Sequence, residues 1–228
     1  MGANLRSILP SNAIFQWKRA WTFWAWAVRA YAKSKPTSVI TSESIGCVTQ
    51  SKAIVAAGRQ PFCIVGVAGT TSTGVIDPLP ELAAIAREND CWFHVDAAYG
   101  GTLAFSEKHR SKLTGIELAN SITFDPHKWM FVPFSCGATL VRDGGQVLRD
   151  SFDMSPEYLS EDRGFSDAQY DFFRYGQMGT RRFNSLKLWM CFKFMGKRGY
   201  AATTERHIEL TEYFGVKARQ LVGFRKNG

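Results

Sequence analysis

An alternation of apolar strands and amphipathic helices between residues 61 and 141 most constrains what this chain can fold into. Its first member, Pro61-Phe-Cys-Ile-Val-Gly-Val-Ala68, is continuously apolar and ends at the turn-rich Gly69–Gly74, as buried parallel strands do. The next, Pro78–Asn89, carries apolar residues three and four positions apart, which predicts a helix with one buried face. Pro78 suits the first turn of such a helix.

The same patterns predict further strands and helices. The strands are expected at Cys91–Val95, Ser121–Phe124 and Gly137–Val141, and the helices around Glu107–Leu113 and at Leu186–Met195 and Ala201–Leu221. Because strands and helices alternate, we expect an open α/β sheet whose ligands bind beyond the carboxyl ends of its strands. The last two helices, separated by Gly196 and Gly199, are expected to begin a second domain.

Composition excludes several classes of protein. The 228 residues are 45% hydrophobic and 21% charged, as in a globular chain of one or two domains. The longest apolar stretch, Ala20–Ala32, is interrupted by Arg29 and falls short of the roughly 20 residues that cross a bilayer. The sequence lacks the pattern of a secretory signal, so we expect a cytoplasmic protein. Neither a disulfide framework nor a metal site is expected, because the cysteines are scattered without ligand spacing: Cys47, Cys63, Cys91, Cys136 and Cys191.

Residues 1–55 differ in composition from the rest of the chain. They hold seven basic residues and one acidic residue, so +6 of the formal net charge of +8 lies there. Four of the seven tryptophans also lie there, without the period of a strand or a helix. One interpretation of this segment is an arm that binds nucleic acid or a membrane surface.

Two residues that follow predicted strands suggest a specific chemistry. Asp96 stands at the carboxyl end of one strand, and Lys128 lies in the turn after Ser121–Phe124. Pyridoxal phosphate enzymes need a lysine amine that forms a Schiff base and a carboxylate that keeps the pyridine nitrogen protonated. Taken alone, an aspartate at a strand end is more often a cap or an ion-pair partner, and a lysine usually lies on the solvated surface.

Four motifs resemble those of the group II pyridoxal-dependent decarboxylases, which include the aromatic amino acid and glutamate decarboxylases. They are Gly69-Thr-Thr71, His94-Val-Asp-Ala-Ala-Tyr-Gly-Gly101, Asp125-Pro-His-Lys-Trp129 and Gly179-Thr-Arg-Arg-Phe-Asn-Ser-Leu-Lys-Leu-Trp189. The resemblance covers about residues 56–224. It implies a type I pyridoxal-phosphate-dependent fold, whose α/β large domain has a mainly parallel sheet, and decarboxylation of an L-amino acid.

The resemblance also implies roles for single residues around the cofactor. Lys128 is then the Schiff-base lysine, and Asp96 is the partner of the pyridinium nitrogen. Ala98 is the small residue packed under the ring, and Thr71 orients Asp96. His127 lies at the phosphate or the imine. The alternative roles are a turn threonine for Thr71 and a histidine packed against Trp129 for His127.

Two further roles follow from the same resemblance. Tyr158 matches a mobile-loop tyrosine that returns a proton to the α-carbon, and a weakly acidic phenol suits that task once loop closure positions it. Phe134 matches a residue that reaches across a dimer interface into the neighbouring site. An ordinary exposed loop and a core phenylalanine are the respective alternatives. Asp125 is not assigned to phosphate binding, because a carboxylate beside a dianion is unfavourable.

The family's phosphate-binding loop and its ring-stacking histidine precede the Gly-Thr-Thr motif, whereas all 4 histidines here follow it. We hypothesise that residues 10–55 are translated out of frame. The codons of Phe23-Trp-Ala-Trp-Ala27, read from the third base, give Leu-Gly-(Leu, Met or Val)-Gly, which resembles the family at this point. The alternative is a divergent natural amino terminus. A continuous open frame in the gene, without a neighbouring one-base insertion or deletion, would disprove the hypothesis.

The sequence thus predicts three segments: an atypical basic, Trp-rich segment 1–55, a cofactor-binding large-domain core 56–178, and the helical start of a small domain 179–228. We expect an incomplete fragment that binds pyridoxal phosphate weakly or not at all. Its intact relatives are expected to decarboxylate an L-amino acid as homodimers, without nucleic-acid or membrane partners. Three alternatives stay open: another reaction on the same fold, such as transamination; a catalytically inactive fragment; and the binding arm described above.

Overall fold

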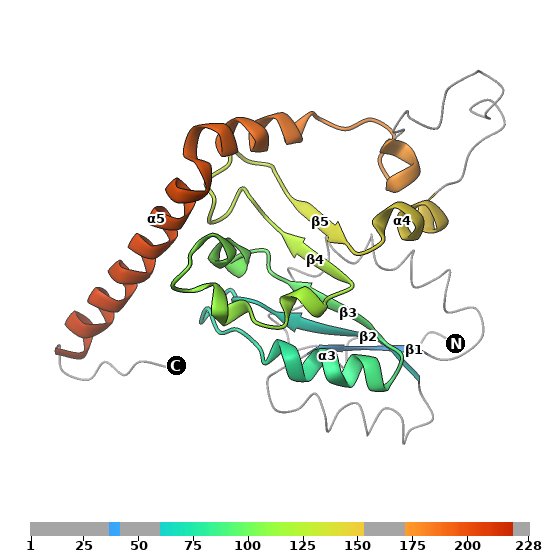
Figure 1. Cartoon of the computed structure of the whole chain (residues 1–228), viewed down its shortest axis with the longest axis horizontal. Helices are drawn as coiled ribbons and strands as arrows, with labels where there is room; N and C mark the ends of the chain where they lie inside the picture. Colours follow the sequence, from blue (N-terminus) through green and yellow to red (C-terminus); the bar gives the residue numbers. More distant parts are fainter. Residues whose placement is uncertain (1–36, 42–59, 153–171, 221–228) are drawn as a thin grey trace. The chain divides into compact units, whose positions relative to one another are not determined.

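A five-stranded sheet organises this computed structural model, which describes residues 37–41, 60–152 and 172–220 (Figure 1). The strand order follows the sequence, and the strands β1 to β4 run parallel while β5 is antiparallel to β4. Their bounds are β1 Thr37–Thr41, β2 Gln60–Val67, β3 Trp92–Asp96, β4 Ser121–Phe124 and β5 Ala138–Val141. The predicted α/β sheet is confirmed, and each predicted strand lies within about one residue of its observed bounds.

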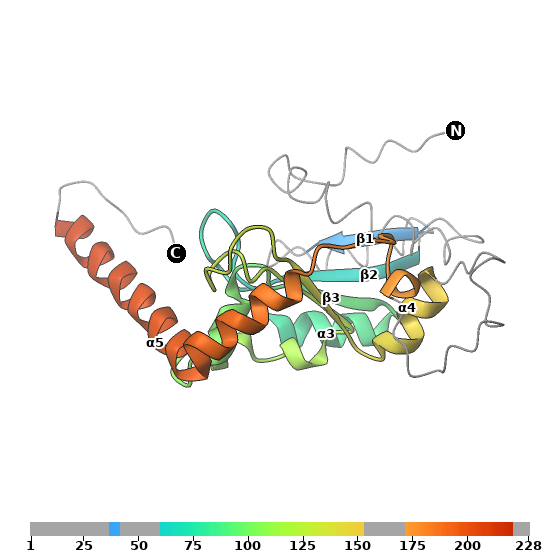
Figure 2. The same cartoon turned by 90° about the horizontal axis from the view of Figure 1, so that it is seen from above.

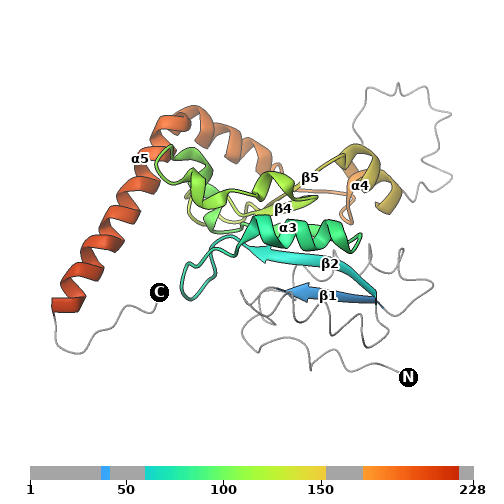
Figure 3. The same ribbon diagram turned by 60° about the horizontal axis from the view of Figure 1, so that its bottom comes forward.

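The interior of β2 is covered on both faces, which explains why its sequence is continuously apolar rather than alternating. Cys63, Ile64 and Val65 are all at most 2% exposed. The helix α3, Leu79–Glu88, packs on one face of β2 and β3, as Figure 3 shows. Gly66 permits this close approach, because a Cβ added there would lie 2.9 Å from Cδ2 of Leu79.

The segment after β3 does not form the α-helix expected around Glu107–Leu113. It forms the short 3-10 helices η2 Gly100–Phe105, η3 Arg110–Leu113 and η4 Ile116–Leu118. Of residues 107–113 only Leu113 is buried, so the segment lacks the apolar face that stabilises a helix. The hydroxyl of Thr114 donates to the carbonyl of Ser111 at 2.6 Å and favours a turn there.

The helix α5, Asn184–Gln220, consists of two helical segments joined at a kink (Figure 2). Gly196 has φ 62° and ψ 176° at this point, a conformation that glycine adopts at low cost. The predicted pair of helices is therefore confirmed, with Gly196 as the break and Gly199 inside the second segment. α5 covers a second apolar cluster whose buried members are Met130, Val132, Cys136 and Tyr200.

Contacts along the chain separate two compact units. Residues 37–142 and 181–220, which include the sheet and α5, belong to one unit. The other contains α4, Gly144–Phe152, and the 3-10 helix η7, Phe172–Tyr175, which contact each other. The three segments predicted from the sequence stay a prediction. None of the helices in the described ranges combines the length and hydropathy of a membrane-crossing segment.

Candidate active site

The carboxyl ends of three parallel strands bring the predicted site residues to one edge of the sheet. β2 leads into the turn that contains Thr71, β3 ends at Asp96, and β4 leads into the turn that contains Lys128. Parallel neighbours share a direction, and the register pairs Val67 with Asp96 and Asp96 with Thr123. Such an edge is where open α/β sheets bind their ligands.

Asp96 is oriented by its own chain. The backbone N–H of Ala98 donates to Oδ1 of Asp96 at 3.1 Å. Burial raises the pKa of the Asp96 carboxyl, while the Ala98 bond and the charge of Lys128 lower it and the charge of Asp125 raises it. The charge of Lys128 therefore acts on Asp96, while the convergence of the two groups on one ring stays a prediction.

Lys128 forms an ion pair inside its own turn. Its Nζ lies 2.9 Å from Oδ2 of Asp125, and the two side chains are 31% and 20% exposed. The backbone N–H of Lys128 also donates to the carbonyl of Asp125 at 2.9 Å. Asp125 thus holds the amine at the edge of the sheet, a role that the motif alone did not indicate.

His94 fastens β3 to β4 directly behind Asp96. It is 5% exposed, and its two ring nitrogens lie 2.7 Å from Oγ of Ser121 and 3.1 Å from Oγ1 of Thr123. Burial lowers the pKa of His94 to about 4, although an interaction with Ser121 raises it. The imidazole is therefore neutral at physiological pH and acts as a structural link.

His127 and Phe134 form a second group beside the Lys128 turn. Nδ1 of His127 lies 2.6 Å from the carbonyl oxygen and 3.1 Å from the nitrogen of Cys136. The Phe134 ring meets the imidazole edge-on, with centroids 4.9 Å apart. Phe134 is 76% exposed, so it does not pack in a core of the described chain. Lys187 of α5 donates to the carbonyls of Pro133 and Ser135, on either side of Phe134.

Three predicted site residues remain: Ala98, Thr71 and Tyr158. Ala98 is 8% exposed and lies directly beyond Asp96. Thr71 is exposed on a pocket wall, and no hydrogen bond among the described residues joins its side chain to Asp96. The Ala98 N–H orients Asp96 instead, because it is two residues away on the same strand end. Tyr158 lies outside the described residues.

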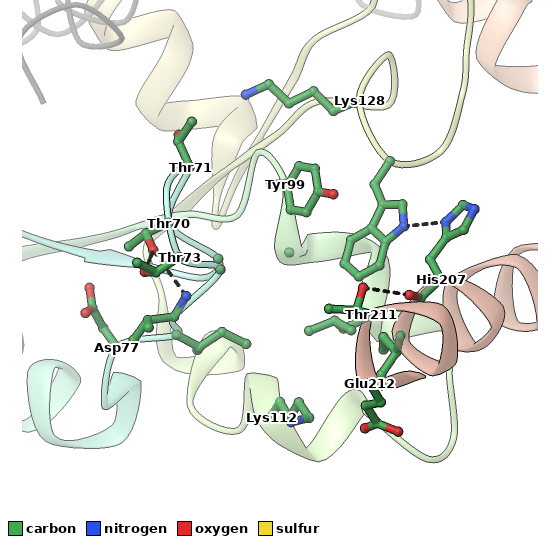
Figure 4. Close-up of a pocket in the computed structure, with 18 of the residues that line it drawn as sticks. Thr70, Thr71, Thr73, Asp77, Tyr99, Lys112, Lys128, His207, Thr211 and Glu212 are labelled. Atoms are coloured by element: carbon green, nitrogen blue, oxygen red, sulfur yellow. Dashed lines mark hydrogen bonds between the residues drawn. The ribbon is translucent and has the colours of Figure 1, made fainter. Parts of the chain in front are cut away.

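A pocket of about 1140 Å³ opens beside Lys128. Lys128 and Thr71 lie toward one end of it, and Lys112 and Glu212 lie at the other (Figure 4). Three aromatic residues, Tyr99, Trp129 and Phe131, and His207 of α5 form part of its lining. His207 could not be predicted as a lining residue from the sequence, because its contacts with Trp129 and Phe131 join distant parts of the chain.

The chemistry of the residues at the sheet edge fits pyridoxal phosphate. The Lys128 amine and the half-buried Asp96 carboxylate, at the ends of neighbouring strands, match the aldehyde and the ring nitrogen of this cofactor. The small side chain of Ala98 lies two residues beyond that carboxylate, and His127 directly precedes Lys128 in the chain.

Comparisons with known proteins identify relatives of this chain. The family model described as the pyridoxal-dependent decarboxylase conserved domain matches residues 12–225. Aromatic-L-amino-acid decarboxylase of Bacillus atrophaeus is 39% identical over 155 residues, which are 68% of this chain and 32% of the relative. Acidic amino acid decarboxylase GADL1 of Xenopus tropicalis is 35% identical over 167 residues, which are 73% of this chain and 33% of the relative.

A solved structure shows the same fold. The crystal structure of mouse CSAD in apo form matches with a TM-score of 0.77 at 26% identity, over 91% of this chain and 49% of that chain. The chain therefore spans about a third of the length of these two curated relatives and about half of the CSAD chain.

Proposed function

This chain belongs to the family of pyridoxal-dependent decarboxylases, and from that membership we propose that it provides the cofactor-holding part of an enzyme that decarboxylates an L-amino acid. One observation carries the proposal: Lys128 and Asp96 both lie at the carboxyl edge of the same sheet, where the charge of Lys128 lowers the pKa of the Asp96 carboxyl. The relatives named above include decarboxylases of aromatic and of acidic amino acids.

Each residue of the edge has a task in this proposal. Lys128 is the group to which the cofactor is covalently attached, and Asp125 holds its amine in place beforehand. Asp96 lies beside the ring nitrogen and favours its protonated form, because a carboxylate stabilises a neighbouring cation. Ala98 leaves room for a flat ring, and His127 lies toward the phosphate. When bound, pyridoxal phosphate supplies an electron sink for the pair of electrons left as carbon dioxide departs.

Two further parts of the proposal concern regions beyond the sheet edge. Tyr158 is the proton donor to the α-carbon. A second copy of the chain completes the site, with Phe134 in the interface; the 76% exposure of this ring supports that arrangement. Sedimentation equilibrium tests it: the wild-type chain is expected to dimerise more tightly than a Phe134→Ser variant. Equal association of both chains would argue against this interface.

The attachment of the cofactor can be tested directly. We expect that incubation with excess pyridoxal phosphate, followed by borohydride reduction, adds the cofactor to Lys128, as read by peptide mass spectrometry. Reduction traps even a short-lived link, so weak affinity does not obscure the result. Lys128→Ala should abolish this adduct. Lys197→Ala should not change it, because Lys197 is an exposed lysine paired with Glu107.

The reaction is tested by its products. A chain that decarboxylates should release carbon dioxide and the corresponding amine from at least one member of a panel of L-amino acids. A keto acid without carbon dioxide would indicate transamination instead. Labelling spread evenly over surface lysines, with Lys128 not preferred, would contradict the proposed role of the site.

A further inference from the structure

A column of aromatic rings joins the site to the second half of α5. The Trp129 indole stacks on Tyr99, with ring centroids 4.9 Å apart and an interplanar angle of 18°. Its Nε1 donates to Nδ1 of His207, 78 residues further along the chain, at 2.9 Å, a bond drawn as a dashed line in Figure 4. Trp129 directly follows Lys128, and Tyr99 directly follows Ala98. Both segments that carry the site are therefore connected to this column.

The hydrogen bond defines which ring nitrogen of His207 is the acceptor. An indole N–H can only donate, so Nδ1 of His207 is the acceptor and carries no proton. The neutral imidazole then has its proton on Nε2. The ring of Phe131 also meets this imidazole, with centroids 5.5 Å apart and an interplanar angle of 63°. His207 thus contacts two of the three residues that follow Lys128.

These contacts differ from the backbone hydrogen bonds inside the turn. The backbone bonds from Lys128 to Asp125 and from Phe131 to Lys128 are local and fix only the shape of the turn. His207 ties the turn to a different element, and that element is itself anchored. Ser106 donates to Glu205 of α5 at 2.7 Å, and Tyr200 of α5 is 2% exposed.

We propose that His207 is a positioning residue, which accepts the Trp129 hydrogen bond and thereby fixes the turn that presents the Lys128 amine. The inference rests on the proposed function of Lys128. It goes beyond that function because it assigns a task in the site to a helix residue outside the four motifs. Loss of the acceptor frees the indole and loosens the turn, so that the amine leaves its ion pair with Asp125 more often.

Three substitutions separate positioning from simple packing. His207→Leu removes the acceptor, whereas His207→Asn keeps an acceptor atom close to the place of Nδ1. Trp129→Phe removes the donor and keeps an aromatic ring. The first readout needs no cofactor: competitive acylation of lysine amines by acetic anhydride, with Lys128 measured relative to Lys197 by mass spectrometry. The second is the rate at which borohydride traps pyridoxal phosphate on Lys128.

We expect His207→Leu and Trp129→Phe each to change the acylation rate of Lys128 and the rate of cofactor trapping by about fivefold. This is the effect of one lost hydrogen bond. His207→Asn should stay within about twofold of the wild-type chain, and the double variant of Trp129→Phe and His207→Leu should change no more than either single variant.

Equal rates in His207→Leu and His207→Asn would overturn the proposal. So would a lower unfolding midpoint with no change at Lys128. Should His207→Leu fail to fold, Trp129→Phe and His207→Asn still decide, since only the former should alter Lys128. A wild-type chain that traps no cofactor on Lys128 would refute the proposed function, while the acylation rates would still test His207.

Discussion

Burial shifts the pKa values of two ionisable residues of β3 in opposite directions. It raises the pKa of Asp96 and lowers that of His94 to about 4, and both shifts favour the neutral form. For Asp96 the hydrogen bond from Ala98 and then the charge of Lys128 oppose the shift. For His94 the outcome is a neutral link between β3 and β4.

The low pKa of His94 predicts a pH dependence of stability. The folded state binds fewer protons than the unfolded state between the unfolded pKa of about 6.5 and the folded pKa of about 4. The free energy of unfolding should therefore fall as the pH falls through this window, by up to about 3 kcal/mol.

Urea unfolding at several pH values measures this effect. His94→Gln should flatten the dependence between pH 6.5 and 4, whereas His109→Gln, at a partly exposed histidine, should leave it in place. The account of His94 is wrong if the histidine variants and the wild-type chain lose stability in parallel.

Among single residues, the sequence predicted the site residues that lie in local motifs. Asp96 and Lys128 lie at strand ends, and strand ends follow from apolar runs that are visible in the sequence. The ion pair of Lys128 with Asp125 and the bond of Trp129 to His207 could not be predicted in this way. The first depends on the shape of one turn, and the second joins residues 78 positions apart.

At the scale of elements, prediction succeeded where burial imposed a pattern. The interior of β2 is apolar because both its faces are covered, and α3 shows its buried stripe in Leu79, Leu82 and Ala86. Residues 100–118 bury few side chains and form three 3-10 helices, whose shape depends on turns rather than on periodicity. A helical pattern was therefore a poor guide there.

The kink of α5 gives a prediction at this scale. Gly196 has a positive φ and no atoms within 4 Å of an added Cβ, so Gly196→Ala should destabilise the chain through backbone strain alone, by about 1 kcal/mol. Gly215 lies in the same helix with ordinary helical geometry and only a 3.8 Å contact to an added Cβ. Gly215→Ala should stabilise the chain by up to about 1 kcal/mol.

Thermal unfolding of both variants checks this. Opposite shifts of the midpoint are expected, because the two alanines meet different backbone conformations. If Gly196→Ala proved as stable as Gly215→Ala, the kink would not be a feature that glycine maintains.

At the scale of the whole molecule, the chain corresponds to part of the length of its relatives. It covers about half of the mouse CSAD chain with the same fold and about a third of two curated relatives. The family match begins at residue 12, and β1, within the atypical segment 1–55, pairs in parallel with β2. The hypothesis of out-of-frame translation for residues 10–55 stays a prediction, which the nucleotide sequence decides.

The central claim is that Lys128 and Asp96 hold opposite ends of one pyridoxal ring, and the protonation of the ring nitrogen tests it most directly. Pyridoxal phosphate labelled with ¹⁵N in the ring should show a protonated nitrogen when trapped on Lys128 of the wild-type chain at neutral pH. In Asp96→Asn, which lacks the carboxylate, the nitrogen should lose its proton. A wild-type ring nitrogen without a proton, or one that Asp96→Asn leaves unchanged, would contradict the account.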